Sequence, residues 1–289
     1  MYKRQHWQES RRRWSLQLAD GRRLTAEFVI SAIGLLSVPT KPRFEGLERF
    51  QGQSFHTFEW PDEPVSLGGK RVGVVGTGAT GIQVIGEIAS KVDALYVFQR
   101  RPNWAAPLNN SRISAAEMDD IRSRYDDIFA LCSRTPGGFA HEPDRRGFWN
   151  LSREERIAFW DELYEQPGFS IWLANFREIF TDEAANAEFS EYIADRIRAR
   201  VNNPVTAEKL IPKDHGFGWQ RVPMETNFYE AFNLPQVHLV DLNDTPISSI
   251  AEAGIETSDG LIPLDLIIYA TGFDAVTGCL LYTSPSPRD

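Results

Sequence analysis

The most regular pattern of apolar and polar positions lies between residues 71 and 98. Residues 71–75 contain a run of apolar side chains, which predicts a buried strand. A helical stretch over 79–90 and a second apolar run over 94–98 follow it. A strand, a helix and a second strand within about 30 residues are typical of a βαβ unit in a parallel sheet. The sequence therefore predicts an α/β fold built around this unit.

Shorter patterns before and after this unit predict further strands. The expected strands lie at 14–18, where apolar and polar residues alternate, and at 28–30, 237–240 and 264–269, where the residues are mostly apolar. Asp20 and Gly21 supply a hairpin turn after the first of them, and the one that begins at 28–30 should be buried. Residues 45–70 have no such pattern, so we expect a loop there.

A long segment, residues 112–200, has the pattern of helices. Two capping boxes, in which a serine is followed three residues later by glutamate, begin at Ser114 and Ser152. Apolar residues recur at helical spacing over 189–197, and we expect Pro204 to stop that helix.

Composition and charge exclude several classes of protein. The chain has 289 residues, enough for about two domains. No apolar run approaches the roughly 18 residues of a membrane span, and the N-terminus lacks a signal-peptide pattern. A net charge of −9 argues against a nucleic-acid surface. Cys132 and Cys279 are too few for a disulfide framework or a metal cluster, so a cytoplasmic protein without a metal is expected. The oligomeric state is left open.

The two ends of the chain look foreign to the protein. Residues 2–5 are what TAT AAG AGA CAG encodes, the end of a common sequencing adapter, and a GTG start codon in it supplies Met1. Residues 279–289 match a reading frame of the reverse complement of that adapter. We interpret residues 1–5 and 279–289 as adapter artefacts, which makes residues 6–278 the native part.

A glycine-rich turn joins the first strand of the βαβ unit to its helix. It consists of Gly76, Thr77, Gly78, Ala79, Thr80 and Gly81. In such a GxGxxG turn the first glycine permits the sharp bend and the second lets backbone N–H groups approach a pyrophosphate. The third lets the helix pack close to the strand, with its N-terminus facing the negative charge. Because a strand precedes it and a helix follows, this turn predicts a dinucleotide site.

The end of the second strand selects between the two nicotinamide dinucleotides. An NAD site usually has an acidic residue there, whereas this chain has Arg100 and Arg101. A guanidinium can pair with the 2′-phosphate of NADP in a bidentate manner. We therefore expect NADP(H) rather than NAD(H).

The segment between the expected N-terminal strands and the βαβ unit resembles a family signature. Phe50, Gly52, His56, Trp60 and Pro61 form the string F-x-G-x-x-x-H-x-x-x-W-P, which resembles the fingerprint of Baeyer–Villiger monooxygenases. The related flavin-containing monooxygenases that oxidise nitrogen and sulfur lack the Trp-Pro ending. Without the family, His56 and Trp60 would be an ordinary linker histidine and a packed aromatic residue.

Other segments resemble the same family. The turn and Gln83 look like its NADP turn, and Arg100 like its reader of the 2′-phosphate. The run 218–223 resembles the segment that carries the active-site arginine, which makes Arg221 the catalytic candidate. Five residues resemble the two crossings between an FAD domain and an NADP domain: Ala32, Gly34, Ala270, Thr271 and Gly272.

The resemblance implies a flavoprotein with two dinucleotide-binding domains. Residues 6–66 would be a partial FAD-domain segment and linker, 67–262 a complete Rossmann-like NADP domain with the helical insert, and 263–278 a return into the FAD domain. It implies that NADPH reduces FAD, that reduced FAD activates O₂, and that a ketone becomes an ester or lactone. Arg221 would supply a permanent positive charge for that chemistry.

Three departures from the family qualify this expectation. Gln220 stands where many relatives have lysine, and Arg101 where threonine is common. The sequence contains no earlier GxGxxG turn for FAD, so we expect the fragment by itself to be colourless and inactive. Two other functions stay open: a nitrogen- or sulfur-oxidising flavoprotein, and an NADP-binding module without catalysis.

Two structural alternatives also remain. Arg221 is the catalytic cation, a salt-bridge partner of Glu225 or a surface charge. The aromatic residues of the helical segment either pack in a core or line a ketone pocket. They are Phe148, Trp149, Phe159, Trp160, Phe169, Trp172 and Phe176.

Overall fold

The computed structural model describes residues 2–274 apart from 31, 33, 35 and 136. The chain divides into two compact units, one made of residues 1–42 and 271–289 and the other of residues 43–270. Residues 279–289, which we interpret as adapter, lie outside the described residues. Among the described residues, no helix is long and apolar enough to cross a membrane.

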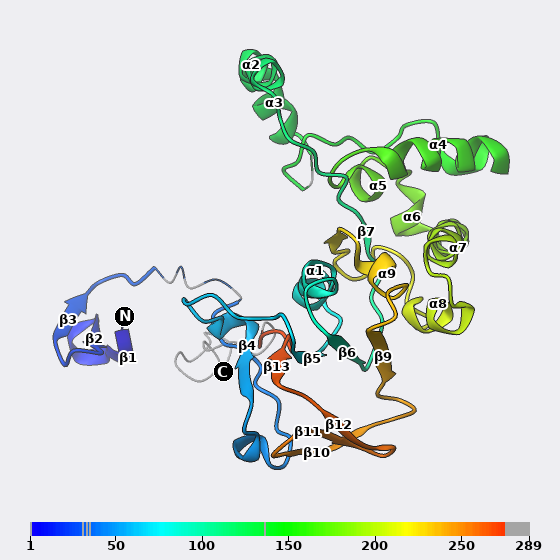
Figure 1. The fold of residues 1–289 in the computed structure, drawn as a ribbon. Coiled ribbons are helices and arrows are strands. Elements are labelled where there is room, and N and C mark those ends of the chain that lie inside the picture. The colour runs from blue at the N-terminus through cyan, green and yellow to red at the C-terminus, as the bar shows by residue number, and fades with distance from the viewer. Residues whose placement is uncertain (1, 31, 33, 35, 136, 275–289) are drawn as a thin grey trace. The chain divides into compact units, whose positions relative to one another are not determined.

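The smaller unit contains a three-stranded antiparallel sheet, drawn in blue in Figure 1. Its strands are β1 (Tyr2–Gln8), β2 (Arg13–Leu18) and β3 (Arg23–Ala26), with a 3₁₀ turn, η1 (Glu9–Arg11), between the first two. The expected hairpin is confirmed, because β2 and β3 pair across the turn at Asp20 and Gly21. Residues 2–5, which we interpret as adapter, form the first part of β1. Backbone pairing of this kind does not depend on the side chains, so it does not bear on that interpretation.

The buried strand expected at 28–30 is wrong for this structure. Phe28 and Ile30 are 84% and 93% exposed, and no strand includes them in the described part of the chain. Apolar residues adopt a buried strand only where neighbouring strands supply hydrogen bonds and a covering layer. Neither is present around these residues in the described part of the chain, so the apolar pattern alone does not produce the element.

The larger unit is built on a parallel sheet of five strands among its described residues. In sheet order they are β4 (Gln53–His56), β13 (Leu266–Tyr269), β5 (Arg71–Val75), β6 (Ala94–Gln99) and β9 (Val237–Asp241). The strands expected at 71–75, 94–98, 237–240 and 264–269 are thus confirmed. The loop expected at 45–70 is partly wrong, because it contains the edge strand β4 and two 3₁₀ turns, η2 (Leu47–Arg49) and η3 (Thr57–Glu59).

Both faces of this sheet are covered. Helix α1 (Ala79–Ile88) covers one face, where Ile82 and Ile85 pack in the same apolar cluster as Val72 and Val74. A small antiparallel sheet covers the other face; it consists of β10 (Ile247–Ala251), β11 (Gly254–Thr257) and β12 (Gly260–Pro263) (Figure 1). Burial on both faces explains why the central strands read as continuous apolar runs.

The helical segment follows the sequence pattern closely. Its elements are α2 (Ala115–Ser123), α3 (Tyr125–Cys132), η4 (Phe148–Asn150), α4 (Arg153–Glu165), α5 (Ser170–Leu173), α6 (Glu178–Thr181) and α7 (Glu183–Arg200). Both capping boxes are present, at Ser114 and Ser152. The prediction for Pro204 is wrong: α7 ends at Arg200, and Pro204 is the first residue of α8 (Pro204–Leu210), where its missing N–H costs nothing.

A short parallel pair connects the helical segment to the Rossmann-like part. It consists of β7 (Ala106–Pro107) and β8 (Met224–Glu225), and α9 (Phe228–Ala231) follows β8.

The aromatic core lies within the helices. Phe148, Trp160 and Phe176 are fully buried and contact one another, so for these three the core interpretation is confirmed. Trp149 is exposed and does not belong to that core.

The boundaries of the compact units differ from the expected domain boundaries. The larger unit extends from residue 43 to residue 270, beyond the expected 67–262. The reason is hydrogen bonding: β4 and β13, expected outside that domain, pair with each other, and β13 also pairs with β5. One boundary falls between Ala270 and Thr271, within the second expected crossing.

Candidate functional site

The glycine-rich turn lies at the carboxyl end of β5, the edge where ligands bind in open α/β sheets. Gly76 has φ of 108°, which favours glycine, and its N–H donates to the carbonyl oxygen of Phe98 at 2.9 Å. A Cβ at Gly81 would collide with the carbonyl oxygen of Gly76. A Cβ at Gly78 would have no atom within 4 Å. Gly78 therefore leaves open space in front of the turn, while Gly76 and Gly81 shape it.

The N-terminus of α1 faces this open space. Gly78 is its N-cap residue and supplies no side chain, so the first N–H groups of the helix have no side-chain cap. Thr80 is exposed, and Ala79 is half-buried at the start of the helix. Uncapped N–H groups and the positive end of the helix dipole together favour an anion. The described turn therefore has the shape and polarity that a pyrophosphate needs.

The two arginines after β6 have different surroundings. Arg100 is exposed, and its side chain makes no hydrogen bond or ion pair within the described part of the chain. Arg101 forms an ion pair with Asp214. Asp214 also accepts from Nδ1 of His215 at 2.7 Å, and this hydrogen bond, together with the charge of Arg101, holds the pKa of Asp214 below its usual value. Of the two expected phosphate readers, Arg100 is available and Arg101 is engaged.

Hydrogen bonds fix the backbone that presents Arg100. The side chain of Gln99 is buried and donates to the carbonyl oxygen of Lys209 at 2.7 Å. Asn243 Nδ2 donates to the carbonyl oxygen of Arg100 at 2.9 Å. Thr77 Oγ1 donates to the carbonyl oxygen of Arg101 at 3.0 Å and thereby ties the glycine turn to the arginine pair. Sequence analysis missed the roles of Gln99 and Asn243, because the partners of both are distant in sequence.

Arg221 lies on a loop that runs beside the end of β6. Asn103 Nδ2 donates to the carbonyl oxygen of Arg221 at 3.3 Å, and Ala106 N–H donates to that of Pro223 at 3.1 Å. Val222, the next residue, is buried and anchors the loop. The Arg221 side chain is exposed and makes no hydrogen bond or ion pair among residues 2–274 as described. The structure therefore places a free guanidinium on a fixed backbone at the edge that carries the glycine turn.

The alternative in which Arg221 pairs with Glu225 is wrong. Glu225 is fully buried and forms its ion pair with Arg200, Nη1 to Oε1, at 2.8 Å. Its Oε2 accepts from the backbone N–H of Phe228 at 3.0 Å. Both oxygens of this carboxylate are thus engaged by other groups. Glu225 joins α7 to the strand β8, and Arg221 is left without that partner.

Helix α1 is positioned by two further residues. Gln83 is exposed, and its Nε2 donates to the carbonyl oxygen of Met224 at 3.5 Å. A Cβ at Gly86 would collide with the carbonyl oxygen of Thr226, so only glycine permits this approach of the helix. Gln83 thus contacts protein in this structure, and Gly86 is a positioning residue that the GxGxxG pattern does not reveal.

The fingerprint residues have structural roles around the edge strand β4. A Cβ at Gly52 would lie 2.6 Å from the carbonyl oxygen of Asp265, so glycine permits the close pairing of β4 with the segment before β13. His56 is buried, and its Nδ1 accepts from the N–H of Phe58 at 3.0 Å. Trp60 makes an edge contact with Phe55, with ring centroids 4.9 Å apart. Phe50 packs on the face covered by β10–β12, and Pro61 is half-buried after η3.

The expected crossing residues are divided between the two units. Ala270 is buried in the larger unit, where its Cβ lies 3.4 Å from the position of a Cβ on Gly81. Thr271 and Gly272 belong to the smaller unit: Thr271 Oγ1 donates to the carbonyl oxygen of Thr40 at 2.6 Å, and Thr40 N–H donates to that of Gly272 at 2.9 Å. Ala32 and Gly34 lie in the smaller unit, and the residue between them falls outside the described residues.

No group of three or more His, Cys, Asp or Glu side chains in the described residues is arranged to hold a metal ion. The candidate site that we consider consists of the glycine turn, the N-terminus of α1, Arg100 and Arg221. Its open cradle of backbone N–H groups and two free guanidinium groups suit a phosphate-bearing dinucleotide and a second anionic group.

Comparisons with known proteins agree on one group of enzymes. The family model described as "Flavin-binding monooxygenase-like" matches residues 20–116. A 2-oxo-Δ³-4,5,5-trimethylcyclopentenylacetyl-CoA monooxygenase of Pseudomonas putida is 48% identical over 278 residues, which cover 94% of this chain and 51% of the relative. The methyl acetate-forming acetone monooxygenase of Gordonia sp. (strain TY-5) is 44% identical, covering 97% of this chain and 53% of that protein.

Solved structures give the same result. The crystal structure of OTEMO in complex with FAD and NADP matches with a TM-score of 0.95 and 46% identity, over 98% of this chain and 55% of that one. The open crystal structure of cyclohexanone monooxygenase matches with a TM-score of 0.93 and 33% identity, over 100% of this chain and 56% of that one. The chain thus spans about half the length of the curated relatives that it matches.

Proposed function

The chain belongs to the Baeyer–Villiger monooxygenases of the flavin-binding monooxygenase-like family, and on this basis we propose the activity of the protein it represents. That protein uses FAD and NADPH to insert one oxygen atom of O₂ next to a ketone carbonyl, giving an ester or lactone. The carrying observation is Arg221, an exposed guanidinium without a partner among the described residues, at the edge that carries the glycine turn. The activity is proposed for the whole protein, since the chain spans about half of its relatives.

NADP(H) is the dinucleotide proposed for the described turn. The open space at Gly78 admits the pyrophosphate, and the uncapped N-terminus of α1 stabilises its charge. Arg100 is proposed to bind the 2′-phosphate, because its guanidinium is exposed while its backbone is held by Asn243. Arg101 would bind the 2′-phosphate only if its ion pair with Asp214 opens.

FAD, when bound, supplies the electron transfer and oxygen activation of the reaction. The residues of this chain do not fit its pyrophosphate, because the sequence contains one strand–GxGxxG–helix turn and that turn is assigned to NADP. Ala32, Gly34 and residues 270–272 are proposed to contact FAD only at the crossings. We derive no step of the reaction through FAD from this chain.

Arg221 is proposed to stabilise negative charge on the oxygen that attacks the ketone. A guanidinium stays protonated throughout the physiological pH range, so the charge does not depend on a proton donor. Its backbone is held by Asn103, so little reorganisation is needed when the charge develops. The described geometry thus supplies a positioned cation.

The test is an assay of the full-length enzyme, recovered from the source DNA and loaded with FAD. We expect NADPH and O₂ consumption that depends on a ketone, with ester or lactone as the product in gas chromatography. Oxidation of thioethers or amines with no ester from any ketone would instead support the nitrogen- or sulfur-oxidising alternative, which the Trp60-Pro61 ending disfavours. Binding of NADP without any oxidation would support the non-catalytic module. We also propose a cytoplasmic location. This proposal is supported by the low cysteine content, since Cys132 is the one cysteine in residues 6–278 and leaves no disulfide framework there.

A further inference from the structure

The loop over residues 211–223, between α8 and β8, carries both Asp214, the partner of Arg101, and Arg221. All of its residues are described, and none of them belongs to a helix or strand. Its position therefore depends on the groups that hold its backbone. Phe217, in the middle of the loop, is fully buried, and both of its backbone polar groups are bound by side chains of another element.

Two side chains of α7 bind the backbone of Phe217. Asn186 Nδ2 donates to the carbonyl oxygen of Phe217 at 2.8 Å, and the N–H of Phe217 donates to Ser190 Oγ at 2.9 Å. Asn186 and Ser190 are four residues apart, so they lie on the same face of the helix. Ser190 Oγ also donates to Asn186 Oδ1 at 3.2 Å, which fixes the two side chains relative to each other. We call Asn186 and Ser190 the α7 clamp.

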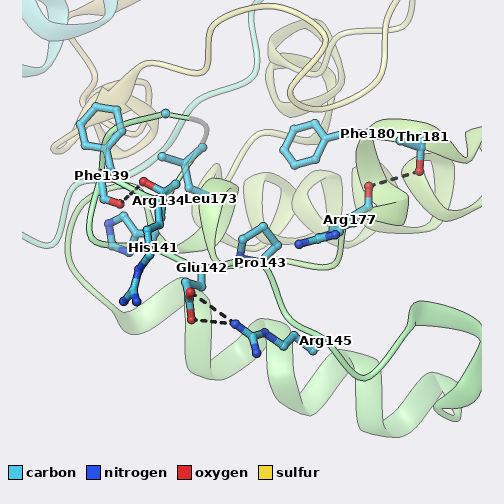
Figure 2. A pocket seen from close by; sticks show the side chains of 12 residues that line it. Arg134, Phe139, His141, Glu142, Pro143, Arg145, Leu173, Arg177, Phe180 and Thr181 are labelled. Atoms are coloured by element: carbon cyan, nitrogen blue, oxygen red, sulfur yellow. Dashed lines mark hydrogen bonds and ion pairs between the residues drawn. The ribbon is translucent and has the colours of Figure 1, made fainter. Parts of the chain in front are cut away.

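The surroundings of Asn186 are specific to an amide. Asn186 is 3% exposed, and its Nδ2 also donates at 2.7 Å to the carbonyl oxygen of Ile179 in α6, the short helix whose Phe180 and Thr181 line the pocket in Figure 2. A Cβ at Gly216 would lie 1.7 Å from Asn186 Oδ1, so only glycine permits this approach of the loop. An apolar side chain would fill the space without the cost of burying polar atoms. A hydrogen-bonded amide instead defines a single position for the loop.

The loop is also held by residues that follow β6. Trp104, which is buried, donates from Nε1 to the carbonyl oxygen of His215 at 2.9 Å. Its ring centroid lies 6.2 Å from that of Phe217. Asn103 Nδ2 donates to the carbonyl oxygen of Arg221 at 3.3 Å. The loop is thus attached to α7 by one set of contacts and to the segment after the arginine pair by another.

We propose that Asn186, together with Ser190, is a positioning residue for Arg221. The α7 clamp fixes the backbone of Phe217, four residues before Arg221. Without the clamp the loop loses both hydrogen bonds to α7, and the guanidinium is no longer held where negative charge develops. The role of Arg221 in this inference rests on the proposed function, whereas the hold of α7 on the loop does not.

Hydrogen–deuterium exchange of the 289-residue chain tests the hold of α7 on the loop and needs no enzyme activity. Asn186→Ala should speed exchange of the amides in 211–223 about threefold to tenfold, by the usual strength of a lost hydrogen bond, and leave exchange in 71–98 unchanged. Ser190→Ala, which removes the acceptor of the Phe217 N–H, should act in the same direction and serves if Asn186→Ala does not fold. Circular dichroism checks that each variant is folded.

Asn175→Ala is the matched control for the exchange experiment. Asn175 is also buried, and the hydrogen bonds of its amide lie within residues 160–176. Its replacement should leave exchange in 211–223 unchanged. Unchanged exchange of the loop in folded Asn186→Ala and Ser190→Ala overturns the proposal. Faster exchange over the whole chain, or equally fast exchange of the loop in Asn175→Ala, also overturns it.

The consequence for Arg221 is measured in the full-length enzyme loaded with FAD. Asn186→Ala should slow oxygenation of the ketone about tenfold or more, because a small misplacement of a catalytic group is costly, while reduction by NADPH stays within about twofold. A residue that only stabilises the fold would lower both rates together. The effect on oxygenation should be absent in an Arg221→Ala background, where no guanidinium remains to be placed.

The outcomes distinguish this inference from the proposed function. An equal loss of both rates in Asn186→Ala, or a further loss of oxygenation when it is added to Arg221→Ala, overturns the positioning role. A parent enzyme that forms no ester from any ketone refutes the proposed function instead. In that case the exchange experiment still decides whether α7 holds the loop.

Discussion

Arg101 and Asp214, which are 113 positions apart in sequence, form an ion pair beside the proposed 2′-phosphate site. The pair engages one of two adjacent arginines and leaves the other, Arg100, exposed. Asp214 is in turn held by His215, so its carboxylate has two partners. An acidic side chain beside a phosphate site repels the ligand and also engages a cation that could bind it, so we expect Asp214 to limit the affinity for NADP(H).

Asp214→Asn should therefore tighten NADP(H) binding. The substitution removes a negative charge and loosens the hold on Arg101, and we expect a gain of about threefold to tenfold, or ~0.7–1.4 kcal/mol. Titration calorimetry measures it. The gain in affinity should be smaller in an Arg101→Ala background, because part of it comes from the Arg101 guanidinium that the substitution of Asp214 releases. Weaker binding in Asp214→Asn would mean that the ion pair positions the turn and does not compete with the ligand.

Arg100→Ala should remove the preference for NADP(H) over NAD(H). A charge-assisted contact to the 2′-phosphate is worth ~1.5–3 kcal/mol, so NADP(H) affinity should fall by one to two orders of magnitude while NAD(H) affinity stays nearly constant. Arg43→Ala removes the same charge from an arginine outside the site. As the control, it should leave the preference for NADP(H) unchanged. An Arg100→Ala variant that keeps its preference would assign the 2′-phosphate to another group.

The turn and the βαβ unit were predictable because their signals are local. Strand, glycines and helix follow one another within residues 71–98, and each glycine has a conformational or packing reason that the sequence already contains. The capping boxes at Ser114 and Ser152 are local in the same sense. Pro204 shows the limit of a local rule, since a proline ends one helix and begins another equally well.

The features that the sequence did not predict depend on distant partners. Strand β4 is short and half polar, and it is a strand only because β13, more than 200 residues later, pairs with it. Phe28 lies in a segment with the pattern of a buried strand, but no neighbouring strand pairs with it among the described residues, and its side chain is exposed. The three-stranded sheet β10–β12 covers one face of the main sheet and was missed, because its short alternating strands are separated by turns that read as loop.

Gly78 and Gly81 should respond differently to the same substitution. Gly81→Ala forces a Cβ against the carbonyl oxygen of Gly76 and should cost ~1–3 kcal/mol of unfolding free energy as well as NADP(H) binding. Gly78→Ala has room and a permitted φ of −79°, so stability should change by less than about 0.5 kcal/mol while NADP(H) binding still falls. Urea titration and calorimetry on the two variants separate these effects. Normal NADP(H) binding in Gly78→Ala would remove the turn from the proposed site.

Asp265 should contribute a pH-dependent part of the stability. Arg71 contacts its carboxylate at 2.7 Å and 3.0 Å, and these hydrogen bonds lower the pKa of Asp265 to about 2. A carboxyl group whose pKa is lowered on folding stabilises fully above its unfolded value of 3.8, and the contribution is lost as the pH falls towards 2. Since both side chains are more than a third exposed, we expect only ~0.5–1 kcal/mol. Urea titrations from pH 6 to pH 2 should show this loss in the parent chain and not in Asp265→Asn.

Arg221→Ala, in the full-length enzyme, should separate cofactor reduction from oxygenation of the ketone. Hydride transfer from NADPH does not develop a negative charge that this cation must stabilise, so reduction of bound FAD should continue at close to the normal rate. Oxygenation should fall by about 10²–10³, because loss of a positioned charge at a developing anion costs ~2.7–4 kcal/mol. Arg221→Lys should be nearly as impaired, since a point charge does not reproduce the planar fork of the guanidinium. Stopped-flow absorbance follows reduction, and gas chromatography follows the ester. If the Ala variant still forms ester at close to the parent rate, Arg221 is a surface residue and the catalytic cation must be sought elsewhere.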